Sequence, residues 1–342
     1  MHNFFFSLIY YFRGFAFFVL TSILSITISC KKEPRKKDLV YDYHDISITG
    51  ADTIYSITFP DPLCGYAITN VGFYKTLNAG ESWTAIDQTN EGFIQFHNRY
   101  YGVLPNGRMT IDGGLNWTQD APYKFACMTE KGTVIALKML SLDFSLMYET
   151  DPFDTIFHFI DTVAYYGINK TVDKVVSRIE SHMGYIVIIP KEVSASDPFM
   201  GISHEGDRYF TLFKDWTHVE RPVDICTGKY GYFHICGGDG YLGTVQLEVP
   251  ETGYNFILYP DRDYFLHEFN YYSIDYFDDF QVAVGQHSIA TNKEIKEEGM
   301  WYKELLNKEK EPFTETFYLL DIINRNTLVT AGTGGKIYYG TF

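Results

Sequence analysis

The chain has 342 residues, of which 46% are apolar, and its 43 acidic and 28 basic side chains give a formal net charge of −15. The length suits one large β-domain, and 28 tyrosines and 28 phenylalanines favour strands over helices. The acidic balance argues against nucleic acid as a partner, because phosphate binding needs a basic patch. It suits solubility or a cationic partner.

The N-terminal segment has the features of an export signal. Phe4–Ser29 is apolar apart mainly from Arg13, and Cys30 and the charged run KKEPRKKD follow it. This order resembles a bacterial lipoprotein signal peptide, although Thr27 stands where that family usually has leucine. The resemblance implies an exported chain, lipid-anchored through acylated Cys30 to the periplasmic or cell-surface side of a bacterial membrane. An uncleaved membrane anchor and ordinary secretion remain alternatives.

We expect three segments: a lipoprotein signal peptide over 1–29, a charged flexible tether over 30–38, and a single domain over 39–342. The cysteines of this domain lack metal-type spacing, and buried thiols are the expectation for them. A disulfide between the last two, which flank a predicted turn, stays open as an alternative. The four cysteines are Cys64, Cys127, Cys226 and Cys236.

Two near copies of one short motif, TLNAGESW and TIDGGLNW, start 34 residues apart at Thr76 and Thr110. Each has Thr first, Asn or Asp two residues later, Gly after four and Trp after seven. The short polar side chain can bond the backbone of a tight turn, and the glycine supplies positive φ. The tryptophan can pack where the next strand starts. The motif residues are Thr76, Asn78, Gly80, Trp83, Thr110, Asp112, Gly114 and Trp117.

These motifs resemble the Asp-box (BNR-repeat) family, which occurs in sialidases, sortilin-like receptors and propellers related to photosystem-II assembly factors. The stretch Gly65–Ile86 is most similar to the last group. The resemblance implies that the box is structural and lies on the outer rim of a propeller blade. Weaker copies are predicted at Thr150–Phe157, which lacks the glycine, and at Ser203–Phe210.

The chain divides into seven repeats of short strands, each a meander. They span about 52–87, 90–119, 122–161, 171–219, 222–259, 266–306 and from 313 to the end. The last repeat is one strand short, and Leu39–Ser47 can supply that strand. We therefore predict an all-β fold, a seven-bladed β-propeller closed by an N-terminal strand. Six or eight blades remain alternatives.

A binding face is expected where two kinds of loop gather: those between repeats and those between the second and third strands of each repeat. The acidic loop DRDYFLHE adds carboxylates that could do acid–base work or bind a hard cation, although a solvated loop is the plainer interpretation. No metal or cofactor is predicted. The candidate binding residues are Asn70, Asn106, Asp239, His287, Asp261, Asp263, His267 and Glu268.

No catalytic residue is assigned, because the motifs contain neither a nucleophile nor a proton-transfer pair. The Arg-Ile-Pro signature of sialidases is absent, and the acidic charge departs from the basic face of the assembly factors. The leading hypothesis is a membrane-tethered, non-catalytic binding or scaffold module for a protein or glycan partner. The alternative is a carbohydrate-active, glycosidase-like enzyme on the same fold.

Overall fold

The computed structural model describes residues 42–341, except 88–91, 105, 120–121, 124, 130, 141–143, 165–175, 183–184, 191–199, 205–210, 214–221, 228–231, 238–241, 249–254, 261–269, 279, 293–301 and 305–312. These residues belong to one compact unit, Val40–Phe342. They form strands and a short 3-10 turn, η3 (Thr333–Gly335), which confirms the all-β prediction. Within this part of the chain, no helix is long and apolar enough to span a membrane.

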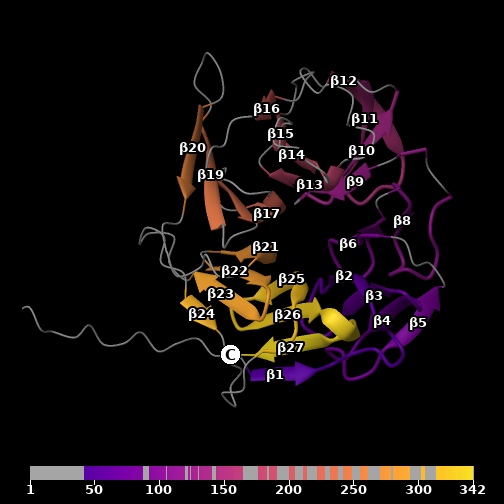
Figure 1. Cartoon of the computed structure of the whole chain (residues 1–342). Helices are drawn as coiled ribbons and strands as arrows, with labels where there is room; N and C mark the ends of the chain where they lie inside the picture. The colour runs from indigo at the N-terminus through magenta and orange to yellow at the C-terminus, as the bar shows by residue number, and fades with distance from the viewer. Residues whose placement is uncertain are drawn as a thin grey trace, which may run out of the picture. The chain divides into compact units, whose positions relative to one another are not determined.

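The strands form seven antiparallel sheets, one for each predicted repeat (Figure 1). The first two sheets contain β2 (Ile54–Thr58), β3 (Gly65–Thr69), β4 (Gly72–Thr76), β5 (Thr84–Asp87), and then β6 (Gln95–Phe96), β7 (Gly102–Val103), β8 (Met109–Thr110). The third contains β9 (Phe125–Met128), β10 (Val134–Met139), β11 (Phe144–Thr150) and β12 (Phe157–Ala164). The fourth contains β13 (Val176–His182), β14 (Tyr185–Pro190), β15 (Met200–His204) and β16 (Thr211–Phe213).

The last three sheets have four strands each. The fifth contains β17 (Pro222–Thr227), β18 (Tyr232–Gly237), β19 (Leu242–Glu248) and β20 (Asn255–Pro260). The sixth contains β21 (Tyr271–Phe277), β22 (Phe280–Gly285), β23 (Ser288–Asn292) and β24 (Tyr302–Glu304). The seventh contains β25 (Phe317–Asn324), β26 (Thr327–Gly332), β27 (Ile337–Thr341) and β1 (Asp42–Asp45).

The seventh sheet joins the two ends of the described chain. β1 pairs antiparallel with β27, from Asp42 opposite Thr341 to Asp45 opposite Tyr338. The Ile46 N–H extends the ladder by donating to the Ile337 carbonyl at 2.9 Å. The outermost strand of the last sheet therefore comes from the start of the domain.

The second sheet has three strands where four were predicted. Thr118, in the predicted fourth strand, does bond to Met109: its N–H donates to the Met109 carbonyl at 2.8 Å. The Met109 N–H, however, donates to the Thr118 hydroxyl at 2.9 Å. A side chain thus replaces one bond of the backbone ladder, and the segment does not continue as a strand.

The first strands of the sheets are tied to one another by side chains. The Asp224 carboxylate on β17 accepts the N–H of Ile274 on β21 at 3.0 Å, and Asp275 on β21 accepts the N–H of Ile322 on β25 at 2.7 Å. Asp321 on β25 in turn accepts the N–H of Phe59, next to β2. Each bond satisfies a backbone donor that strand pairing within its own sheet leaves open.

The series continues into the next two sheets through neutral side chains. The Ser56 hydroxyl on β2 accepts the N–H of Ile94 at 3.0 Å, next to β6. The side-chain amide oxygen of Gln95 on β6 accepts the N–H of Met128 on β9 at 2.7 Å. β13 contacts both β9 and β17, and β25 contacts both β21 and β2.

Apolar side chains fill the spaces between neighbouring sheets. Ala67 of the first sheet packs with Val329 and Ile337 of the seventh, all at 1% exposure or less. Tyr66 and Phe73 of the first sheet pack in the same way against the second. Burying one such large side chain stabilises a fold by about 1.5–3 kcal/mol, so these layers hold adjacent sheets together.

Candidate binding face

Five first strands begin with the same irregularity. Their pairing with the second strand shifts register between the first and third residue, so the second residue is an additional one. An additional residue of this kind is a β-bulge, which re-aims the side chain that it carries. The bulged residues are Tyr55, Ser177, Val223, Tyr272 and Tyr318.

Three bulged residues expose large side chains, although they lie next to buried residues in the same strands. Tyr55 is 44% exposed, Val223 39% and Tyr318 46%. The residues that follow the first two, Ser56 and Asp224, are buried. The bulges therefore present apolar and aromatic groups to solvent at the start of the first strands.

The loops between second and third strands are fastened to this end of the sheets. The Asn70 N–H donates to the Thr53 carbonyl at 3.1 Å, and the Gln286 N–H to the Asn270 carbonyl at 2.9 Å. The Thr333 N–H donates to the Thr316 carbonyl at 3.0 Å. The three acceptors immediately precede β2, β21 and β25, so these loops lie beside the bulged residues.

The predicted candidate residues fall into two groups. Asn70 is engaged locally, because its side-chain oxygen accepts the N–H groups of Asp52 and Thr53 at 3.0 and 3.2 Å. Asn106 likewise accepts the Arg108 N–H at 3.2 Å, whereas the His287 side chain is exposed and its φ is +52°. The other candidates lie outside the described residues: Asp239, Asp261, Asp263, His267 and Glu268. The acidic loop therefore stays a prediction, and so does the glycosidase alternative.

The bulged tyrosines were missed by sequence reasoning, although a signal is present. The chain reads TIYSIT from Thr53, NYYSID from Asn270 and TFYLLD from Thr316. A polar residue, an apolar residue and a tyrosine thus recur at each strand start. The alternation suggested ordinary strands, and only the register reveals the bulge.

The motif residues at the opposite end form two matching turns. In the first, the Thr76 hydroxyl donates to the Asn78 side-chain oxygen at 2.8 Å and accepts the Gly80 N–H at 2.9 Å. Thr110 makes the corresponding bonds to Asp112 and Gly114 at the same two distances. In both turns the glycine has a φ of +87°.

These turns dock onto the preceding sheet. A Cβ on Gly80 would lie 2.4 Å from Cδ1 of Ile46, and a Cβ on Gly114 would lie 2.9 Å from Cδ1 of Ile86. The Trp83 indole N–H donates to the Ile46 carbonyl at 2.8 Å. The first turn thus closes on the segment after β1, and the second closes on β5.

The weaker copy at Thr150–Phe157 folds differently. The Thr150 hydroxyl accepts the N–H of Val134, on the neighbouring strand, at 3.0 Å. The Asp154 N–H closes the turn on the Asp151 carbonyl at 3.1 Å, and Phe153 rather than a glycine has positive φ, +59°. Most of the copy at Ser203–Phe210 lies outside the described residues.

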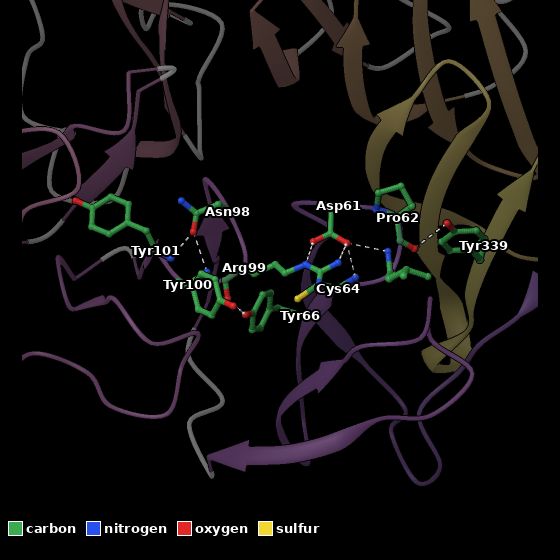
Figure 2. Close-up of polar contacts among 10 residues, drawn as sticks. Asp61, Pro62, Cys64, Tyr66, Asn98, Arg99, Tyr100, Tyr101 and Tyr339 are labelled. Carbon is green, nitrogen blue, oxygen red and sulfur yellow. Dashed lines mark hydrogen bonds and ion pairs between the residues drawn. The ribbon is translucent and has the colours of Figure 1, made fainter.

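Tyrosine hydroxyls connect each of three sheets to a turn of the next, and Figure 2 shows the bonds of Tyr339 and Tyr66. Tyr339 donates to the Pro62 carbonyl at 2.9 Å, and Tyr66 to the Arg99 carbonyl at 2.6 Å. Tyr101 donates to the Asp154 carbonyl at 2.7 Å. Burial raises the pKa of all three phenols, so they stay protonated and keep donating.

An ion pair links the same turns of the first two sheets. Arg99 contacts Asp61 through Nε at 2.5 Å and Nη2 at 2.9 Å (Figure 2). Asp61 also accepts the N–H groups of Leu63 and Cys64. Partial burial opposes ionisation, but the Arg99 bond and these N–H groups hold the pKa of Asp61 below its ordinary value. The cluster is a structural joint, because the Asp61 carboxylate is bonded to Arg99 of the next sheet and to two N–H groups of its own turn.

All four cysteines of the domain are buried thiols. Cys226 lies opposite His234 and Cys236 opposite Asp224, so the register separates the pair for which a disulfide was considered. No cluster of three or more metal-binding side chains occurs among the residues that the structure describes.

No protein-family model and no curated protein matches the chain. Solved structures do: YCF48 from Cyanidioschyzon merolae superposes with a TM-score of 0.64 and 13% identity, over 88% of this chain and 98% of that one. A structure described as YCF48 bound to D1 peptide superposes with a TM-score of 0.62 and 14% identity, over 88% of this chain and 97% of that one. The Cps50 (Swd1) beta-propeller domain of Myceliophteria thermophila superposes with a TM-score of 0.57 and 10% identity, over 88% of this chain and 99% of that one. The fold is a β-propeller.

In a propeller, a blade is one antiparallel sheet of the ring. The bulged residues and the loops fastened beside them lie at one end of the blades. The turns after Thr76 and Thr110 follow the third strand of their blade and lie at the other end. The first end presents exposed side chains, whereas the second end uses its motif residues for contacts between blades.

Proposed function

We propose that this chain is a non-catalytic binding module for a protein partner, built on a seven-bladed propeller and tethered to a membrane through lipidated Cys30. The observation that carries the binding role is the set of exposed bulged residues, Tyr55, Val223 and Tyr318, on otherwise packed first strands. Large aromatic groups held at the start of rigid strands are well placed to serve as anchors for a partner. The peptide-bound YCF48 structure shows that a propeller of this fold can hold a peptide.

Three observations support a closed ring of seven blades. The described residues form seven sheets, and β25 of the last contacts β2 of the first. β1 completes the last sheet by pairing with β27. Closing the ring in this way would protect the outer edge of β27 from pairing with another chain.

The anchor is supported by the sequence around Cys30 and by the position of the domain boundary. The compact unit begins at Val40, one residue after the predicted start of the domain. A signal peptide over 1–29 and a tether over 30–38 would then place the propeller a short distance from the membrane.

Crosslinking on native membranes, followed by purification of the full chain, tests the binding role. The proposal predicts that one protein partner is recovered reproducibly. Failure to recover any protein, together with measurable hydrolysis of a glycan by the purified chain, would contradict it and favour the glycosidase alternative.

Intact-mass measurement of the chain from its native membranes tests the anchor separately. The expected product starts at Cys30 and carries added acyl mass, and Cys30→Ala abolishes this product. An unmodified chain that retains residues 1–29 would instead identify a membrane-spanning anchor.

A further inference from the structure

Three of the bulged residues are tyrosines on consecutive first strands. Tyr272 lies on β21, Tyr318 on β25 and Tyr55 on β2; we call them the tyrosine row. The rings of Tyr272 and Tyr318 are in contact, with centroids 5.1 Å apart and planes tilted by 49°. Figure 1 shows the three strands as neighbours in this order.

The step from Tyr318 to Tyr55 repeats the step from Tyr272 to Tyr318. Asp275, three residues after Tyr272, accepts the N–H of Ile322, four residues after Tyr318. Asp321, three residues after Tyr318, accepts the N–H of Phe59, four residues after Tyr55. Equal offsets set the same shift between both pairs of strands, so Tyr55 occupies on β2 the position that Tyr318 occupies on β25.

The row is flanked by carboxylates. Asp52 and Glu315 lie three residues before Tyr55 and Tyr318 respectively, and Asp52 is exposed. The Tyr338 hydroxyl donates to Glu315 at 2.7 Å; partial burial opposes ionisation, but this bond lowers the pKa of Glu315. Lys336, which lies in the adjoining loop, is paired with Asp45 at 2.5 Å.

We propose that the tyrosine row binds a lysine or arginine side chain on a segment of the protein partner. The face of a tyrosine ring attracts a cation, and the flanking carboxylates and the net charge of −15 add to that attraction. A neutral sugar would gain nothing from this charge. Two touching rings tilted by 49° also offer no shared flat platform for it. This inference rests on the proposed function and names the chemistry of the partner.

Fluorescence polarisation with a short capped peptide of alternating lysine and alanine tests the row on the purified full chain. The matched peptide has glutamate in place of lysine. We expect the lysine peptide alone to bind and Tyr318→Ala to weaken it about tenfold, whereas Tyr318→Phe, which keeps the ring, stays within about threefold. Tyr100→Ala is the control, because Tyr100 is 63% exposed but lies in a turn at the opposite end; its affinity should be unchanged.

Equal affinity of the wild type and Tyr318→Ala for the lysine peptide would overturn the proposal, since binding would then come from diffuse charge. The proposal would also be overturned if the chain did not bind the lysine peptide and instead bound a neutral oligosaccharide at the tyrosine row. Because Tyr318 is nearly half exposed, the variant should fold, and circular dichroism checks this. Tyr272→Ala is a second variant that removes a ring of the row, and it should weaken binding of the lysine peptide as well.

Crosslinking on membranes separates this inference from the proposed function. A partner recovered equally with the wild type and with Tyr318→Ala would reject the row and leave the binding role intact. No partner with any version of the chain would reject the binding role itself.

Discussion

Single residues carry the contacts between blades, and Gly80 is the sharpest example. Its φ of +87° and the nearness of Ile46 leave no room for a Cβ. Gly50 has nearly the same φ, +84°, but nothing lies within 4 Å of its Cβ position. Comparing substitutions at Gly50 and Gly80 therefore separates the free-energy cost of the backbone conformation from that of the contact with Ile46.

We predict that Gly50→Ala lowers the free energy of unfolding by about 1 kcal/mol, the cost of a left-handed alanine. Gly80→Ala should cost about 1–3 kcal/mol more, because Ile46 must shift. Urea unfolding of both variants measures the difference. Equal losses would show that the turn after Thr76 does not depend on its contact with the preceding sheet.

His234 makes stability depend on pH. It is fully buried between the fifth and sixth sheets, stacks on Tyr276 at 5.2 Å and contacts the Gln281 amide at 3.0 Å. Burial lowers the pKa of His234 from 6.5 to about 3. Between these values the unfolded chain binds a proton that the folded chain does not, so stability falls as the pH drops below 6.5.

We expect the free energy of unfolding to fall by about 1 kcal/mol between about pH 7 and about pH 5.5 because of this histidine. His234→Gln should remove that slope while keeping a polar group beside Gln281. Urea titrations of the wild type and the variant at the two pH values measure this change in the free energy of unfolding. An unchanged slope in the variant would mean that another group titrates in this range.

At the scale of the element, the sequence predicted strands well because alternation and β-branched or aromatic residues mark them directly. GYAIT, GFYKT, FQVAVG and TLVTAG are strands as expected. The strand expected after Trp117 is absent, because the Thr118 hydroxyl takes the place of a backbone acceptor. A side-chain hydroxyl competes with the backbone in this way only when its position in the fold allows it, and strand propensity does not include that position.

The first strands carry a second feature that local sequence did not reveal: their carboxylates bond the next strand. We predict that Asp275→Ala lowers the free energy of unfolding by about 1–3 kcal/mol, because the Ile322 N–H loses its acceptor. Asp52→Ala, at an exposed position, should have little effect. Thermal unfolding of both variants checks this, and similar melting temperatures would contradict a role for the carboxylate.

For the whole molecule, repeat counting predicted seven units, and the structure contains seven sheets. The candidate binding residues stay a prediction. The loops expected to bind do lie at the end with the exposed bulges, but the side chain of Asn70 is used to hold its own loop. The exposed tyrosines could not be found from periodicity, because a bulge changes the direction of a side chain without changing the composition of a strand.

Pairing of β1 with β27 should stabilise the propeller. A chain beginning at Ile46 keeps the buried residues Ile46 and Ile48 but lacks β1. We expect a lower melting temperature and concentration-dependent association, because the outer edge of β27 becomes available to other chains. Size-exclusion chromatography and thermal unfolding measure both. A monomer with unchanged stability would show that β1 is dispensable.

Site-specific photocrosslinking shows which end of the propeller binds the partner. A photoreactive phenylalanine analogue placed at Tyr318 of the full chain should form a covalent adduct with a protein partner. The same group at Tyr100, which is exposed at the other end, should form none. Adducts at Tyr100 with none at Tyr318 would contradict the account and move the binding face to the end that carries the motif turns.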